Sequence, residues 1–197
     1  MPVEPLDTAQ HNREDFSCGV EGVDRYFQAV ARQAAEKHAS QSYVLVPPQP
    51  RPVPCEVIGY YTLVAHTYRD PAMDATTAKA LKISGLTGSI PMILLGQLGI
   101  GIAHQGRGVG AMLLREALRR SLHAALSIGG VAIITDPINA AADAFYQKHG
   151  FNSLIAGQSR LYIPTAVLAR YNPDVVAMFK NQPQMLDINF GTQHFLA

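Results

Sequence analysis

The sequence predicts an α/β domain built around a mixed β-sheet, and three observations support this prediction. The chain gives three strand patterns, followed by a helix, a strand, a second helix and a last strand. Residues 92–136 have the order strand, helix, strand, which is typical of a crossover between parallel strands. The 197 residues, 48% of them hydrophobic, are enough to bury a core within one compact domain.

The first half of the chain predicts a helix and a β-hairpin. Residues 20–38 carry apolar residues at helical spacing, with charged residues mostly on the remaining faces, so we expect an amphipathic helix. SYVLV at residues 42–46 and the β-branched and aromatic stretch at 56–68 predict paired strands. The segment PPQPRPVP between them cannot pair within a sheet and predicts the turn. A short helix is expected near residues 76–81.

The second half predicts the crossover and the end of the sheet. A third strand is expected at residues 92–103, and a helix at 109–127, where leucines recur every four residues from Leu114 to Leu126. A strand at 131–136 and a last strand at 160–164 flank a helix at 139–149, for which Asn139 is the expected N-cap. We therefore assign residues 1–164 to a single domain and 165–197 to a C-terminal appendage.

Charge and cysteine content exclude several classes of protein. The formal net charge is +1, so we expect no general electrostatic field for nucleic acid, although a local basic face is compatible with it. Cys18 and Cys55 lack CxxC spacing, which argues against a disulfide scaffold or a zinc site and fits a reducing cytosol. The polar N-terminus does not resemble a signal peptide, and the apolar run at 90–103 is too short to span a membrane. We expect a cytoplasmic protein.

The stretch HQGRGVG, residues 104–110, lies between a predicted strand and a predicted helix. Glycines there permit positive φ angles and bring the backbone close to a ligand, while the first amides of the helix attract an anion such as a pyrophosphate. The simpler alternative is a tight turn without a ligand. The dinucleotide pattern GxGxxG fits only loosely, and the phosphate-loop pattern fails because no GK[ST] follows.

Several segments resemble one family. Gln105–Gly110 matches the [QR]xxGx[GA] signature of the GNAT acetyltransferases, and the chain resembles the aminoacyl-tRNA-acetylating toxins of bacterial type II toxin–antitoxin modules. The segments FSCG, VDRYF, SYVLV, VIGYYTL, IPMILLGQLGI, LLREALRRS and AFYQKHGF occur in that family's order. The resemblance covers residues 16–164. It implies the GNAT fold, in which a mixed central sheet with flanking helices is splayed around acetyl-CoA.

The resemblance also implies ligands and partners. Acetyl-CoA would be the co-substrate, with no metal; aminoacyl-tRNA would be the acceptor, and a small DNA-binding antitoxin of the ribbon-helix-helix type the partner of a homodimer. The implied cofactor-binding residues are Leu98, Gly99 and Ile100 along the third strand, Gln105, Gly106, Arg107, Gly108, Gly110 and Ala111 around the pyrophosphate, and Asn139. The chain departs from the family pattern at Gln97, where relatives tend to have arginine, and at Gly99 and Gly101.

Tyr146 is the expected catalytic residue, as a general acid that protonates the leaving thiolate. The reference pKa values of a phenol and a thiol differ by little more than one unit, so the transfer is feasible. Spacing alone favours a tyrosine packed in the core; the family motif favours the acid. We find no convincing general base among Glu116, Asp136, His104 and His149. An acceptor that is already substantially neutral, such as an α-amino group, suits a site without a base.

Two further questions stay open at the level of sequence. Arg25, Arg32, Lys37 and Arg119 are candidate tRNA contacts, while the alternative for each is an ordinary solvated helix face. Arg115 and Arg120 lie on the same predicted helix as Arg119. The alternative activities are acetylation of a small-molecule or peptide amine, and a non-catalytic acyl-CoA sensor.

Overall fold

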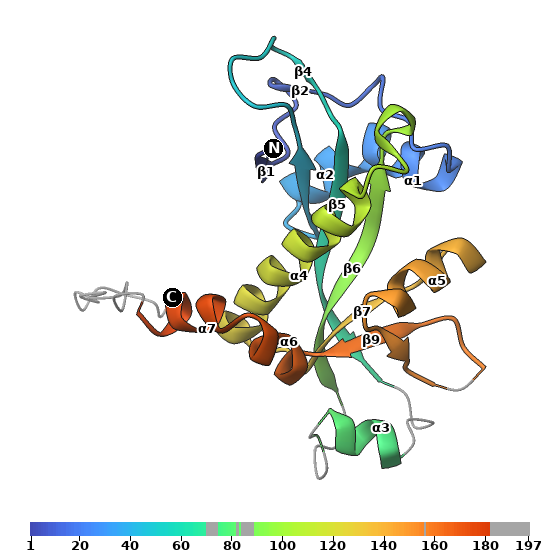
Figure 1. Cartoon of the computed structure of the whole chain (residues 1–197), viewed down its shortest axis with the longest axis vertical. Coiled ribbons are helices and arrows are strands. Elements are labelled where there is room, and N and C mark those ends of the chain that lie inside the picture. Colours follow the sequence, from blue (N-terminus) through green and yellow to red (C-terminus); the bar gives the residue numbers. More distant parts are fainter. Residues whose placement is uncertain (70–74, 82, 84–88, 156, 182–197) are drawn as a thin grey trace, which may run out of the picture.

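The computed structural model describes residues 1–69, 75–81, 83, 89–155 and 157–181, which form a seven-stranded sheet in the order β1-β3-β5-β6-β7-β9-β8 (Figure 1). Its strands are β1 (Val3–Pro5), β3 (Gln41–Leu45), β5 (Gly59–Tyr68), β6 (Ile90–Ile100), β7 (Ala132–Thr135), β8 (Asn152–Ser153) and β9 (Leu161–Pro164). Strands β2 (His11–Asn12) and β4 (Cys55–Glu56) form a separate parallel pair. Within the larger sheet, β6 and β7 are parallel and the other described pairs are antiparallel.

Helices cover both faces of this sheet. They are α1 (Glu21–Arg25), a π-helical segment (Tyr26–Val30), α2 (Ala31–Glu36), α3 (Ala75–Ala80), α4 (Val109–Ile128), α5 (Ala140–Lys148), α6 (Thr165–Tyr171) and α7 (Pro173–Lys180). Neighbouring residues of a strand point to opposite faces. Tyr61 packs in the core cluster under α4 and α5, whereas Tyr60 packs in the cluster under α1 and α2. The two helix pairs therefore lie on opposite sides of the sheet.

The structure confirms the predicted hairpin and crossover. Strand β3 pairs with β5, with Tyr43 opposite Tyr61, and β6 pairs in parallel with β7. Asn139 is the N-cap of α5, where its Oδ1 accepts a hydrogen bond from the amide of Ala142 at 2.8 Å. The predicted N-terminal helix is interrupted by the π-helical segment. The strands β1, β2, β4 and β8 were not predicted, because two or three residues are too few for a period to show.

Part of the predicted appendage packs against the domain. Helices α6 and α7 lie against α4, and Leu168 and Val175 belong to the main core cluster. Arg119 of α4 forms a two-pronged ion pair with Asp174 of α7, with nitrogen–oxygen distances of 3.1 and 2.5 Å. Residues 182–197 of the predicted appendage, and much of the predicted connection between β5 and β6, lie outside the described residues.

Strands β6 and β7 diverge soon after they pair. Their described pairing covers Ile93 with Ile133 and Leu94 with Ile134, while β6 continues to Ile100 against β5. At the point of divergence, the Thr135 hydroxyl donates a hydrogen bond to the Leu95 carbonyl at 3.0 Å. Figure 1 shows the resulting V, with β6 on one arm and β7 with α5 on the other. We call the end where the strands separate the fork.

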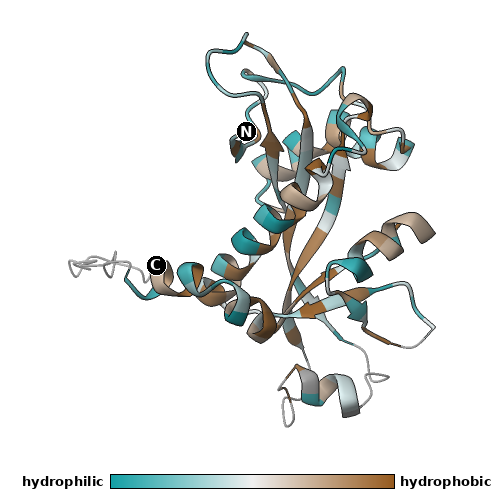
Figure 2. Ribbon diagram, in the orientation of Figure 1, coloured by the Kyte–Doolittle hydropathy of each residue, from teal (hydrophilic) through white to brown (hydrophobic). Residues whose placement is uncertain are grey.

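Hydropathy follows the layers of the fold. Figure 2 shows apolar residues concentrated along the strands and on the inner sides of the helices, with polar residues on outward surfaces and loops. Among the described helices, none combines the length and the apolar character needed to cross a membrane.

Candidate active site

The open edge of β6 presents backbone groups to the V. The Gly101 amide donates to the Ile58 carbonyl at 2.9 Å, so Gly101 directs its backbone toward the β5 side. Backbone direction alternates along a strand, and Leu98 and Ile100 therefore direct their N–H and C=O groups to the other side. The Ile100 carbonyl confirms this, because it accepts a hydrogen bond from Gln105 on the open side, at 2.9 Å. This edge can pair with an extended ligand.

The glycine loop lies at the beginning of α4. Gly106 and Gly108 have φ angles of +71° and +78°, in the left-handed region that favours glycine. A Cβ added at either position would meet nothing within 4 Å, so the space beside both is open. The first amides of α4 have no intrahelical acceptors, and Gly108 offers no side-chain cap. Together with the exposed Arg107, these amides form a cradle that suits a pyrophosphate.

Tyr146 lies at the fork, inside the core. Its side chain is buried, at 6% exposed, and its ring packs edge-to-face on Phe145 and Phe151. Burial raises the pKa of Tyr146, and a hydrogen bond with Thr135 opposes that rise. The phenol therefore keeps its proton at neutral pH. Because the Thr135 hydroxyl also bonds to Leu95, the Tyr146 hydroxyl is held beside the point where β6 and β7 separate.

Several predicted cofactor-binding residues also have partners within the protein. The Gln105 amide group donates to the Cys18 and Ile100 carbonyls, and the Asn139 side chain caps α5. Gly99 is buried, and a Cβ there would lie 3.0 Å from Val23 and 3.2 Å from Tyr60. This glycine lets α1 approach the sheet closely, a role that we did not infer from the sequence.

The candidate bases of the sequence are engaged in contacts within the protein. Asp136 is held by Arg160 through two hydrogen bonds, of 2.7 and 2.6 Å. His104 pairs with Glu56, and His149 Nδ1 lies 2.7 Å from the Phe145 carbonyl. Glu116 pairs with Arg120 at 3.2 Å, but this pair is half-buried, because Arg120 also bonds to Tyr61 and stacks on Tyr43. Nothing in the sequence indicated these two tyrosine contacts, because they join residues far apart in the chain.

One further titratable residue, His66, was not singled out from the sequence. His66 of β5 lies 3.5 Å from Arg160, and burial together with the Arg160 charge lowers the pKa of the imidazole. It is therefore neutral at pH 7. A histidine in a strand pattern carries no signal of this kind, because Arg160 reaches it from a distant part of the chain.

The predicted tRNA contacts do not form one surface. Arg25, Arg32 and Lys37 are exposed along the helical segment from α1 to the end of α2, and Arg32 lies 3.5 Å from Glu36. Arg119 lies on α4, across the sheet, and is paired with Asp174. A phosphate at Arg119 would have to compete with that carboxylate.

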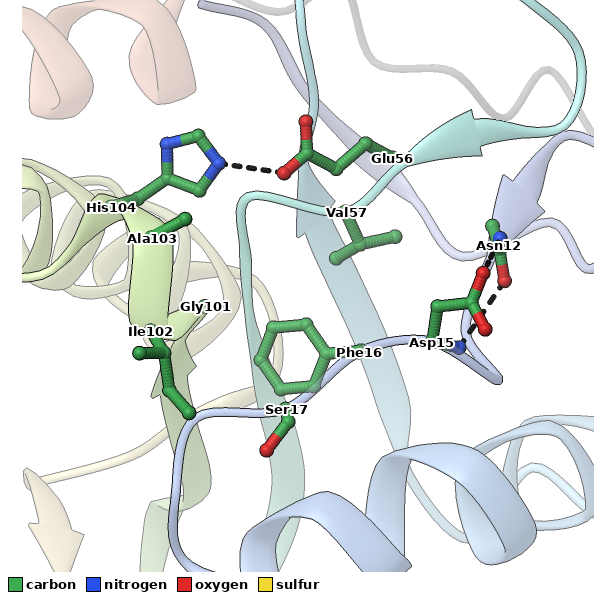
Figure 3. Close-up of a pocket in the computed structure, with 10 residues that line it drawn as sticks. All are labelled: Asn12, Asp15, Phe16, Ser17, Glu56, Val57, Gly101, Ile102, Ala103 and His104. Carbon is green, nitrogen blue, oxygen red and sulfur yellow. Dashed lines mark hydrogen bonds and ion pairs between the residues drawn. The ribbon is translucent and has the colours of Figure 1, made fainter.

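A cavity of about 390 Å³ lies between the N-terminal segment and the turn that follows β6 (Figure 3). The N-terminal segment at Phe16 and Ser17 forms one wall, and the turn of residues 101–104 forms the other. The His104–Glu56 pair, at 2.7 Å, closes one side. Among the described residues, no group of three histidine, cysteine or acidic side chains is arranged to hold a metal ion.

Comparisons with known proteins agree with this geometry. The family profile described as acetyltransferase (GNAT) domain matches residues 57–153. The chain is 27% identical to "Probable toxin TacT" of Sinorhizobium fredii, over 84% of this chain and 92% of the relative. It is 29% identical to "tRNA-acetylating toxin" of Mycobacterium tuberculosis, over 69% and 75% of the two chains.

Solved structures show the same fold. AtaTR bound with acetyl-CoA superposes with a TM-score of 0.73 at 26% identity, covering 86% of this chain and 96% of that one. AtaT complexed with acetyl-methionyl-tRNAfMet gives 0.74 at 25% identity, covering 86% and 98%. A tyrosine-to-phenylalanine variant of AtaT, bound to the C-terminus of the antitoxin AtaR and acetyl-CoA, gives 0.71 at 24% identity, covering 86% and 96%. The expected GNAT fold is thus confirmed, and residues 57–153 match a GNAT acetyltransferase domain.

Proposed function

We propose that this enzyme transfers the acetyl group of acetyl-CoA to the α-amino group of aminoacyl-tRNA, and blocks translation as the toxin of a toxin–antitoxin module. The observation that carries the proposal is that the curated relatives matching most of this chain are toxins, one of them tRNA-acetylating. A structural neighbour at 25% identity is complexed with an acetylated aminoacyl-tRNA, which favours this acceptor over a small-molecule or peptide amine. Charged tRNA is a cytoplasmic acceptor, so the enzyme would act in the cytoplasm.

The residues of the V fit acetyl-CoA. The cradle beside Gly106 and Gly108 is open where a side chain would otherwise lie, which is what a pyrophosphate requires. From there, the free edge of β6 leads along Ile100 and Leu98 toward the fork, in the manner of an added strand. Bound there, acetyl-CoA supplies an acetyl group activated as a thioester.

The protein's part in the chemistry is positioning, polarisation and proton supply. A free amide of the β6 edge donates to the acetyl carbonyl and stabilises the negative charge that develops on its oxygen. The amine nitrogen forms a bond to the carbonyl carbon, the carbon–sulfur bond breaks, and the electron pair leaves with sulfur. Tyr146 gives its proton to that sulfur, and the amine gives up its own proton to solvent.

The structure supplies no free base to assist the amine among the groups considered above. This suits an α-amino group, which has a reference pKa near 7.7–8.0 and is substantially neutral at pH 7. A lysine side chain, with a reference pKa of about 10.4, would need a base. The proposal therefore favours an α-amine acceptor on chemical grounds as well.

Partners follow from the same relatives. We propose a small DNA-binding antitoxin, of the ribbon-helix-helix type, and a homodimeric toxin; the antitoxin is supported by the AtaR complex of the neighbour AtaT. Arg25, Arg32 and Lys37 stay candidate tRNA contacts because they are exposed. We also retain residue 164 as the proposed end of the GNAT domain, with α6 and α7 as an appendage that packs against it.

The test is translation in a cell-free extract with and without acetyl-CoA. The enzyme should stop protein synthesis only when acetyl-CoA is present, and mass spectrometry of the recovered tRNA should show acetylated aminoacyl ends. Arrest without acetyl-CoA, or arrest with unmodified tRNA, would contradict the proposal. Acetylation of a small amine with tRNA left unchanged would favour the alternative acceptor.

A further inference from the structure

The side chain of Gln105 is used in a way that the sequence does not reveal. Gln105 is exposed, yet its Nε2 donates to two backbone carbonyls, that of Cys18 at 2.8 Å and that of Ile100 at 2.9 Å. An amide nitrogen has two hydrogens, so both donors are engaged. The sequence placed this residue among those holding the pyrophosphate. The structure directs its donors instead toward β6 and the N-terminal segment.

The partner segment spans residues 17–22, which we call the strap. Its first residues are fixed by the Ile102 amide, which donates to the Ser17 carbonyl at 3.0 Å, and by the carboxylate of Asp24. The Ile102 side chain lies 3.7 Å from where a Cβ of Gly19 would be. Figure 3 shows Ile102 beside Ser17. The strap is thus attached to the turn between β6 and the glycine loop, with Gln105 as its only described side-chain donor from that turn.

The far end of the strap reaches the other arm of the V. Ile138, in the loop between β7 and α5, has its Cδ1 3.9 Å from where a Cβ of Gly22 would be. The strap therefore runs from the β6 arm to the β7 arm. It does so on the face covered by α1, because Val23, the next residue, packs in the core cluster of that face.

The two faces of the fork differ in how accessible they are to an acceptor amine. Tyr146 of α5 approaches the fork from the face shared with α4, and this face is filled by the main core cluster. The free edge of β6 is occupied by acetyl-CoA when acetyl-CoA is bound. An amine must therefore approach from the opposite face, the side on which the strap meets Ile138, which is 57% exposed.

We propose that Gln105 is a positioning residue that fixes the strap, and thereby couples the acetyl-CoA side of the fork to the entrance for the acceptor. The coupling rests on the proposed function insofar as the acceptor is aminoacyl-tRNA. Gln105 also occupies the Ile100 carbonyl while leaving the Ile100 amide directed to the open edge. This marks the cradle end of the β6 edge that an extended ligand can use.

The test compares three variants. Gln105→Met has a similar length but no donor, Gln105→Arg keeps donors that can reach backbone carbonyls, and Gln33→Met is a matched control on the exposed side of α2. Amide hydrogen exchange of peptides covering residues 17–22 is measured with and without acetyl-CoA. Separate KM values for acetyl-CoA and for aminoacyl-tRNA are measured in the acetylation assay.

Gln105→Met should speed exchange of the strap, and raise the KM for aminoacyl-tRNA on the order of tenfold, as expected for two lost hydrogen bonds. Gln105→Arg should restore slow exchange, and Gln33→Met should change neither quantity. Wild-type exchange of the strap in Gln105→Met, with only the KM for acetyl-CoA raised, would overturn the proposal and assign the side chain to the phosphate site.

The exchange measurement separates this proposal from the proposed function. If the wild type fails to acetylate aminoacyl-tRNA, the proposed function is wrong, while the exchange of the strap still tests the role of Gln105. If Gln105→Met does not fold, Gln105→Ala removes the same donors with less side chain to place. Rapid strap exchange in the folded alanine variant supports the proposal, and protected exchange contradicts it.

Discussion

Replacing Tyr146 by phenylalanine should abolish most of the transfer activity while leaving the protein folded. The substitution deletes one oxygen from a buried ring and keeps the edge-to-face packing on Phe145 and Phe151. Thr135 loses a neighbour but keeps its hydrogen bond to the Leu95 carbonyl, so no buried hydroxyl is stranded. The free energy of unfolding should therefore change by about 1 kcal/mol or less, the typical net value of one hydrogen bond.

The effect on rate should be much larger than the effect on stability. Losing a positioned general acid typically lowers the rate about a hundred- to ten-thousand-fold, which corresponds to roughly 3–5 kcal/mol of barrier. Burial raises the pKa of Tyr146, which by itself weakens the acid. The same burial disfavours the thiolate, however, so the two effects oppose each other in the proton transfer.

The assay is single-turnover acetylation at saturating acetyl-CoA, together with calorimetric binding of acetyl-CoA and thermal unfolding. A rate loss that saturating acetyl-CoA does not restore identifies the acid. A loss that acetyl-CoA restores would mean that the hydroxyl only seats the co-substrate. In cells lacking the antitoxin, the wild type should arrest growth and the phenylalanine variant should be tolerated. Near-normal turnover of the variant would remove Tyr146 from the mechanism.

Three other substitutions test separate parts of the site. Gly108→Val should fold but lose acetyl-CoA binding in calorimetry, because a β-branched residue resists the φ of +78° and its methyl groups would fill the cradle; retained affinity would make the loop a simple turn. Reversing the charges of Arg32 and Lys37 together should weaken tRNA binding and flatten its salt dependence in filter binding, with acetyl-CoA affinity unchanged, and an unaltered salt slope would move the contact elsewhere. In the folded wild type the pKa of His66 is lowered from 6.5, so the unfolded state takes up the proton first and the free energy of unfolding falls as the pH drops below 6.5. His66→Gln removes this group and should reduce that loss of stability, as measured by urea unfolding. Equal pH dependence of the free energy of unfolding in the wild type and in His66→Gln would contradict this prediction.

Long elements with a regular hydrophobic pattern were predictable from the sequence, and their predicted boundaries were within a few residues of those observed. Helix α4 follows from leucines at every fourth position, and the crossover from β6 to β7 follows from strand and helix patterns in series. The end strand β1 depends instead on tertiary contacts. Glu4 of that strand accepts from His11 and Arg51, which no local pattern connects.

The features of the site that depend on local backbone conformation were predictable from the sequence. Those that depend on side-chain contacts between residues far apart in the chain were less so. The left-handed Gly106 and Gly108 were indicated by the glycine pattern alone. The signature could not show that the Gln105 side chain turns back to Cys18, because that contact joins positions 87 residues apart. The sequence marked Gly99 as a departure from the family pattern, and its buried contact with α1 gives it a packing role.

The most direct test of the central claim is acetylation by the purified protein with isotopically labelled acetyl-CoA. Charged tRNA and the same tRNA after deacylation are offered side by side, and the 3′-terminal nucleosides released by nuclease are examined by mass spectrometry. We predict one labelled acetyl group on the α-amino group of the aminoacyl ester, and none on the deacylated tRNA. Label on the tRNA itself, or on a free amine with the aminoacyl ester unmodified, would contradict it.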